Sequence, residues 1–238
     1  MQNRRLFTWV GGLIMLMTLA CSLPTVPDIG LGPAPTPTPI GNSIEFWTPT
    51  YTAGLSPGEM VPGARLEYVG LQESGVYQVK IDGQPVVKRN ADSFFWNGVM
   101  APGVIGNYEL RVGAEILGAL QVAGPLTVSV LNPLPIEITS LPIDATYWNF
   151  KNFVVDYRVP VGHLLPGTPI LFTGTQVQGE NTLAILGNSS DYTQLAFGDS
   201  MVYNGQLLDN VFIRYSLRTS SIEDDVLRLT GTAELWIR

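Results

Sequence analysis

Residues 92–98 read DSFFWNG, and residues 199–205 read DSMVYNG. Both stretches begin with Asp-Ser and end with Asn-Gly, 107 positions apart. Further residues recur at the same spacing: Val104, Tyr108, Leu110-Arg111 and Gly124 return as Val211, Tyr215, Leu217-Arg218 and Gly231. Recurrence at a fixed spacing indicates that the chain carries two copies of one module.

The repeat extends toward the N-terminus at a slightly shorter spacing of 104 residues. The three-residue change falls between Gly83 and Asp92, so the second copy has the longer loop there. We place copy one at residues 43–131 and copy two at residues 132–238, and we expect the shared residues to be scaffold. The matching positions are Pro62-Gly63, Gly70, Ile81 and Gly83 with Pro166-Gly167, Gly174, Ile185 and Gly187.

The apolar residues of both copies alternate with polar ones, and no stretch after residue 42 has the 3.6-residue period of a helix. The clearest example is the last strand, residues 227–237, which predicts one half-buried strand. Leu227, Leu229, Ala233, Leu235 and Ile237 face one way, and Arg228, Thr230, Thr232, Glu234 and Trp236 face the other.

Turn residues separate these strands. Asn97-Gly98 and Asn204-Gly205 predict type I′ hairpin turns. Both central residues of such a turn need positive φ, which Asn and Gly tolerate best. Asp82-Gly83 is a third candidate. Pro62-Gly63 and Pro166-Gly167 are expected to form a turn before a strand, since proline cannot donate a hydrogen bond inside a ladder.

Each copy therefore has about seven short strands in roughly 90–105 residues, which is the scale of an immunoglobulin-like sandwich. The stretch from Pro102 to Val112 resembles the entry to strand F of such domains. The resemblance implies that Tyr108, and Tyr215 in copy two, hydrogen-bonds back to the chain. The expected fold is all-β, with two tandem, internally duplicated immunoglobulin-like β-sandwich domains. Small β-barrels are the alternative, because they have the same strand signals.

The first 21 residues have the features of a signal peptide. Arg4 and Arg5 precede an uncharged apolar stretch, Leu6–Ala20, which is shorter than the ~20 residues of a bilayer span. Thr18-Leu19-Ala20-Cys21 then resembles a bacterial lipoprotein cleavage box, which implies lipidation of Cys21. Cys21 is the only cysteine, so it has no disulfide partner within the chain. Ordinary cleavage after Ala20 and an uncleaved anchor are the alternatives.

Residues 22–42 are rich in proline and threonine, which predicts a linker in extended form at ~3.1 Å per residue. Loss of the leader removes two arginines and no acid, so the formal net charge changes from −7 to −9. No cluster of Lys or Arg remains, which argues against nucleic acid as a partner. The expected location is extracytoplasmic, with the lipid holding the chain at the cell membrane.

Copy two contains additional residues that copy one lacks. One set includes Asp144–Lys151, and the other is the longer loop Asn188–Thr193. Repeat proteins often carry function in such insertions, so these residues are our prediction for a binding surface. The alternative is an extra edge strand or a longer loop without function. The candidate residues are Tyr147, Trp148, Asp191 and Tyr192, together with Trp236 on the polar side of the last strand.

The motifs for catalysis are weak. Gly198-Asp199-Ser200-Met201 resembles the nucleophile block of an esterase family, in which the histidine that serves as the base follows the serine in sequence. The only histidine of this chain, His163, precedes Ser200. Copy one has Asp92-Ser93 at the same place, so a turn is the expected role. Neither a metal site nor a cofactor is predicted; Glu223-Asp224-Asp225 is expected to be a solvated turn, with calcium binding as the alternative.

The sequence therefore predicts a lipid-anchored protein that uses its β domains for binding or structural interaction at the cell envelope, and not an enzyme. A protein or envelope partner is expected, and a glycan is possible. The enzymatic alternative is a glycoside hydrolase with a pair of carboxylates from copy two. The candidate carboxylates are Asp144, Asp156, Glu180, Asp191 and Asp199.

Overall fold

The computed structural model describes residues 43–141, 144, 146–189 and 191–238. The leader, the linker and Cys21 lie outside these residues. The described residues form antiparallel sheets without helices, so the all-β prediction is confirmed. They accordingly include no helix with the length and apolar character needed to cross a bilayer.

Each copy contributes seven strands in the same order. In copy one these are β1 (Ser43–Leu55), β2 (Leu66–Leu71), β3 (Tyr77–Ile81), β4 (Gln84–Lys88), β5 (Ser93–Ala101), β6 (Val104–Ile116) and β7 (Ala119–Leu131). In copy two they are β9 (Trp148–Pro160), β10 (Leu171–Gln178), β11 (Asn181–Gly187), β12 (Gln194–Ala196), β13 (Ser200–Leu208), β14 (Val211–Ile222) and β15 (Val226–Ile237). Copy two has one strand more, the two-residue β8 (Ile136–Glu137).

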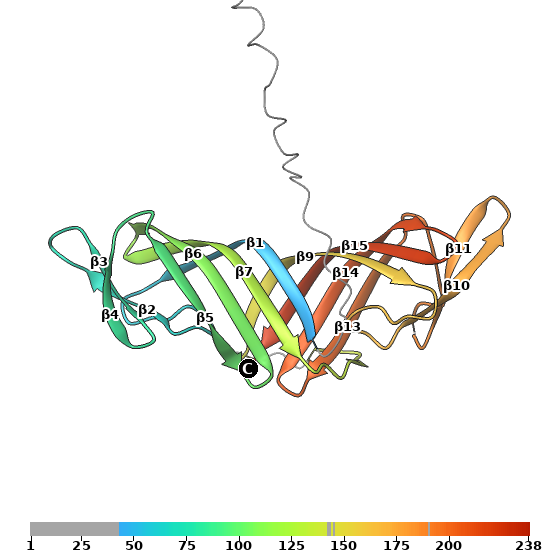
Figure 1. Cartoon of the computed structure of the whole chain (residues 1–238), viewed down its shortest axis with the longest axis horizontal. Coiled ribbons are helices and arrows are strands. Elements are labelled where there is room, and N and C mark those ends of the chain that lie inside the picture. The colour runs from blue at the N-terminus through green and yellow to red at the C-terminus, as the bar shows by residue number, and fades with distance from the viewer. Residues whose placement is uncertain (1–42, 142–143, 145, 190) are drawn as a thin grey trace, which may run out of the picture. The chain divides into compact units, whose positions relative to one another are not determined.

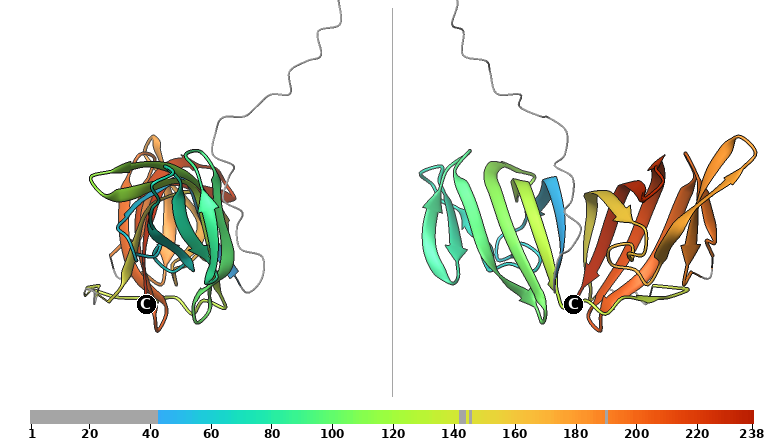
Figure 2. Two further views of the ribbon diagram at one scale, coloured as in Figure 1. Left: turned by 90° about the vertical axis from the view of Figure 1, so that its left-hand side faces the viewer. Right: turned by 45° about the vertical axis from the view of Figure 1, so that its right-hand side comes forward.

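The long strands of both copies join in one nine-stranded sheet, which is curled and has the order β5-β6-β7-β1-β9-β15-β14-β13-β8 (Figure 1). The remaining strands form two three-stranded sheets, β2-β3-β4 and β10-β11-β12. The β10–β11 hairpin projects past the long strands of its own copy (Figure 2). Within each copy, four long strands and a three-stranded sheet make an arrangement consistent with a β-sandwich.

The two copies meet at their first strands. β1 and β9 are equivalent in the repeat, and they pair antiparallel at Trp47 and Val154. Phe46 and Phe153 lie side by side there, with ring centroids 5.9 Å apart. The sequence predicted tandem domains but not this shared sheet. The pairing removes an open edge from each copy, which explains why equivalent strands meet in the middle.

The Asn-Gly pairs are not turns, so this prediction was wrong. Asn97 lies inside β5 and pairs with Asn107, and the chain reverses after Ala101. Asn204-Gly205 lies inside β13 in the same way. The glycines are needed for packing: a Cβ on Gly98 would lie 2.6 Å from the Trp96 ring, and one on Gly205 would lie 2.5 Å from the Tyr203 ring.

Other turn predictions are confirmed. Asp82 and Gly83 have φ of 51° and 80° and connect β3 to β4.

Tyr215 donates to the carbonyl of Pro166 at 3.1 Å, and Tyr108 donates in the same way to Pro62. Each tyrosine thus hydrogen-bonds back to the chain as expected. The partner, however, is the distant Pro-Gly turn before the second strand and not a nearby corner.

The last strand has the predicted faces. Its apolar residues from Leu227 to Ile237 are buried in the core. Trp236 lies on the opposite face but is only 5% exposed, because it packs beside Phe212, its cross-strand partner, and under Arg214, 5.5 Å from the ring centroid. A small aromatic cluster therefore covers this side of β14 and β15.

Candidate functional site

The residues predicted as a binding surface lie in three separate places. Tyr147 packs edge-on against Phe212, with ring centroids 5.6 Å apart. The Arg238 guanidinium lies over the Tyr147 ring, 4.9 Å from its centroid. Because Trp236 also flanks Phe212, Tyr147 and Trp236 belong to one cluster. The segment before β9 thus uses Tyr147 to cover the second face of the sheet.

Trp148 lies at the junction of the two copies and is 36% exposed. Its ring approaches the turn of copy one so closely that a Cβ on Gly63 would lie 3.3 Å from it. Trp148 also borders a shallow hollow with Met60, Val99 and Met100. It therefore contributes to contact between the copies while part of its ring stays accessible.

Asp191 is exposed, and the neighbouring Tyr192 is half-buried against the core. The hydroxyl of Tyr192 accepts a hydrogen bond from the backbone N–H of Val202 at 3.0 Å. That N–H points away from β14, at the outer edge of β13. The longer loop of copy two therefore satisfies one donor of an edge strand.

β8 covers the same edge of β13. Ile136 and Glu137 pair with Gln206 and Gly205. On either side, the N–H of Leu134 donates to Leu207 at 2.8 Å, and the N–H of Ile138 donates to Asn204 at 3.1 Å. β8 and Tyr192, neither of which has a counterpart among the described residues of copy one, thus occupy outward backbone groups of β13.

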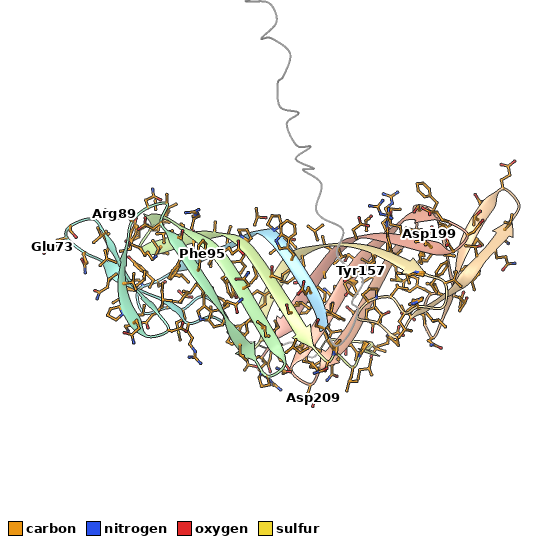
Figure 3. The ribbon with its side chains drawn as sticks, viewed as in Figure 1. Glu73, Arg89, Phe95, Tyr157, Asp199 and Asp209 are labelled. Atoms are coloured by element: carbon orange, nitrogen blue, oxygen red, sulfur yellow. The ribbon has the colours of Figure 1, made fainter. Side chains whose placement is uncertain are left out.

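In copy one, no strand of the described residues pairs with the outer edge of β5, the equivalent of β13. We call this outer backbone of Ser93–Ala101 the β5 edge. β5 carries no charged residue and no proline, the features that usually protect an edge strand. Two of its side chains on the face away from the core are apolar and exposed, Phe95 at 52% and Val99 at 69%. Figure 3 labels Phe95 on β5 and Asp199 just before β13.

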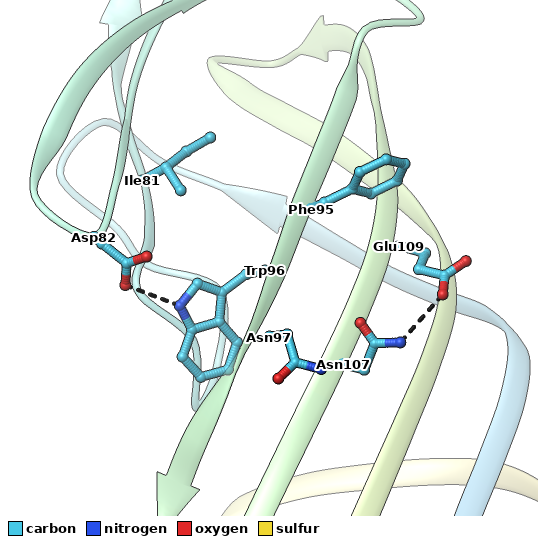
Figure 4. A pocket seen from close by; sticks show the side chains of 7 residues that line it. All are labelled: Ile81, Asp82, Phe95, Trp96, Asn97, Asn107 and Glu109. Atoms are coloured by element: carbon cyan, nitrogen blue, oxygen red, sulfur yellow. Dashed lines mark hydrogen bonds between the residues drawn. The ribbon is translucent and has the colours of Figure 1, made fainter.

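A hollow of about 410 Å³ runs beside the β5 edge. Asp82 lies on one side, where its carboxylate accepts a hydrogen bond from the Trp96 indole at 3.1 Å (Figure 4). Glu109 lies on the other side and accepts a hydrogen bond from the Asn107 amide at 3.1 Å. The lining residues are Ile81, Asp82, Phe95, Trp96, Asn97, Asn107 and Glu109.

Several carboxylates of copy two have structural partners. Asp156 accepts two hydrogen bonds from Arg228, and the nearer contact, to the guanidinium Nη2, is 2.5 Å. The Arg228 guanidinium lowers the pKa of Asp156, and hydrogen bonds from Thr146 lower the pKa of Asp144. Within the described part of the chain, no three His, Cys, Asp or Glu side chains lie close enough to hold a metal ion.

The esterase-like motif is the turn that the sequence predicted. The Asp199 carboxylate accepts a hydrogen bond from the N–H of Ala196 at 2.7 Å. Asp92 accepts from the N–H of Arg89 at the same distance in copy one. His163 is exposed, and its Nδ1 lies 3.2 Å from the carbonyl of Val161.

The β5 edge was not among the sites predicted from the sequence. The available signal was indirect, because the edge is defined by a loop that is shorter in copy one and by β8, which has no counterpart among the described residues of copy one. Chemically, the edge offers a row of backbone donors and acceptors, flanked by Phe95 and Val99. This is what an added β-strand requires, namely main-chain hydrogen bonds with alternate side chains for specificity.

No protein-family model matches the chain, and neither the curated proteins nor the solved structures include a match.

Proposed function

We propose that this chain is a lipid-anchored, extracytoplasmic protein that binds a protein partner at the cell envelope through the β5 edge. The observation that supports the proposal is the contrast between two equivalent strands. β13 has its outer backbone groups covered by β8 and Tyr192, whereas nothing in the described chain covers β5. Unpaired backbone groups of this kind favour pairing with another strand.

A strand from a protein fits this edge better than a glycan does. The outward backbone of β5 repeats along nine residues, which matches the repeat of another extended chain. A sugar site would instead need polar side chains directed at one compact ligand. Phe95 is the exposed aromatic side chain in the hollow, and its neighbours Asn107 and Glu109 are already bonded to each other.

The N-terminal sequence supports the anchor. The signal-peptide pattern of residues 1–21 ends at Cys21, and the proline-rich residues 22–42 would span up to ~60 Å when extended. A linker of this length would hold the β fold away from the membrane surface. The β5 edge would then be accessible to other envelope proteins.

Replacing the cysteine tests the anchor. Cys21→Ser removes the thiol that carries the lipid, and we expect the protein to move from the membrane fraction to the soluble fraction when cells are fractionated. Ser22→Ala, one position further on, is the matched control and should stay with the membrane. Membrane association of Cys21→Ser equal to that of the unchanged protein would contradict the lipid anchor.

A further inference from the structure

The two ends of the nine-stranded sheet differ. One end is β8, which is two residues long and follows Pro135, so it offers few backbone groups to a further strand. The other end is the nine-residue β5 edge. The sheet therefore has one edge suited to an added strand.

The outward positions of β5 follow from its equivalent in copy two. The N–H of Val202 and the carbonyl of Asn204 point away from β14, as their bonds to Tyr192 and Ile138 show. Phe95 and Asn97 occupy these positions in copy one, and Val99 follows at the same period of two. The same three residues place their side chains on the face away from the core.

The side chains of Phe95, Asn97 and Val99 are complementary to the same three side chains of a second, antiparallel β5 strand. Phe95 and Val99 lie two positions before and after Asn97. When two β5 strands pair antiparallel with Asn97 opposite Asn97, each Phe95 faces Val99 of the other strand. Aromatic and β-branched residues form favourable cross-strand pairs, and no charged residue of β5 opposes another.

We propose that the partner of the β5 edge is a second copy of this chain, which pairs β5 with β5 across a two-fold axis at Asn97. This inference rests on the proposed function, since it names the partner of the same edge. The sheet would then run without interruption through both molecules, by the same antiparallel pairing of equivalent strands that joins β1 to β9.

This contact closes at a dimer. An isologous pair uses the β5 edge of both molecules, and the opposite end of each sheet is the short β8. If β13 were also open, the same pairing could continue from molecule to molecule into a fibre. Coverage of β13 by β8 and Tyr192 prevents this.

Photo-cross-linking of the full chain in membranes tests the dimer. A benzophenone amino acid placed at Phe95 keeps an aromatic side chain at the edge and would lie against Val99 of the second molecule. The matched control is the same substitution at Val202, the equivalent position on β13, which is 51% exposed. We expect an adduct of twice the chain mass at position 95, and none at position 202.

Three results would overturn the inference. An adduct with a different protein would leave the β5 edge as a binding site, with another partner. An adduct of unchanged mass would mean that a segment of the same chain covers β5. Absence of any adduct at position 95 would remove both the dimer and the binding role of the edge, whereas the lipid anchor is tested separately by Cys21→Ser.

A pair of introduced charges tests the register of the β5–β5 pairing. Phe95→Lys places a cation opposite Val99 of the second molecule, and we expect light scattering of the full chain in detergent to give half the mass of the unchanged protein. Adding Val99→Glu creates two Lys–Glu pairs across the two-fold axis and should restore the dimer. Failure of the double variant to recover the dimer mass, when Phe95→Lys alone dissociates it, would contradict the register at Asn97.

Discussion

Gly231→Ala is expected to destabilise the fold by about 3 kcal/mol or more, because the new methyl group has no space. A Cβ on Gly231 would lie 2.0 Å from the carbonyl oxygen of Ser216 and 3.0 Å from the Cα of Leu217. Both atoms belong to the backbone of β14, which pairs with β15 here. The strands would have to separate to admit the side chain. Urea unfolding followed by circular dichroism measures the loss.

Copy one provides a second test at the equivalent residue. A Cβ on Gly124 would lie 2.3 Å from the carbonyl oxygen of Glu109, so Gly124→Ala should be similarly destabilising. Gly54→Ala is the control, because its Cβ would approach side chains and no backbone atom: the flexible amide end of Gln121 at 3.0 Å and the Ala119 methyl at 3.7 Å. Equal unfolding midpoints for Gly231→Ala and Gly54→Ala would contradict the close approach of the backbones.

The protein is also expected to lose stability steeply above pH 10. Burial raises the pKa of Tyr51 to about 12 and holds the pKa of five further phenols well above their usual value near 10. The folded state therefore resists deprotonation that the unfolded chain undergoes near pH 10. The phenols with raised pKa are Tyr51, Tyr68, Tyr108, Tyr157, Tyr203 and Tyr215.

The direction of this pH effect on the unfolding free energy follows from the linkage between proton binding and folding. Because the folded pKa of each phenol lies above the unfolded value, its contribution is complete below pH 10 and is lost as the pH rises toward the folded pKa. Each pH unit in this window removes about 1.4 kcal/mol for each such tyrosine. Unfolding free energies measured in urea between pH 8 and pH 11.5 should therefore fall. Tyr51→Phe, which has no proton to lose at this position, should reduce the slope. A stability independent of pH across this range would contradict the burial of these phenols.

Much of the fold could be predicted from the repeat and the strand pattern. The alternation of residues 227–237 placed the right side chains in the core, and the shared Tyr108 and Tyr215 have the same backbone bond in both copies. The Asn-Gly pairs misled because glycine serves two purposes. Gly98 and Gly205 allow an aromatic ring to lie across the strand, and the sequence alone does not distinguish this use from a turn.

The sequence could not predict the contacts between the copies. Trp47 on β1 pairs with Val154 on β9, a long-range contact that local patterns do not encode. Of the two predicted insertions in copy two, Asn188–Thr193 is a loop between β11 and β12, whereas Trp148–Lys151 belong to β9, the equivalent of β1. The contacts of both segments depend on that same distant packing. Tyr192 bonds to β13, and Tyr147 covers Phe212. The β5 edge likewise depends on tertiary structure, because it contrasts with the coverage of the equivalent strand β13 by β8 and Tyr192.

Amide hydrogen exchange on β5 and β13 tests the account most directly, because it compares equivalent strands in one sample. The full-length Phe95→Lys variant, which should be monomeric, is the sample to use. We predict fast exchange for the outward amides of Asn97 and Val99, and slow exchange for Val202, whose N–H is bonded to Tyr192. Equal protection of the two strands in this monomer would contradict the claim that copy two covers its edge while copy one leaves β5 open.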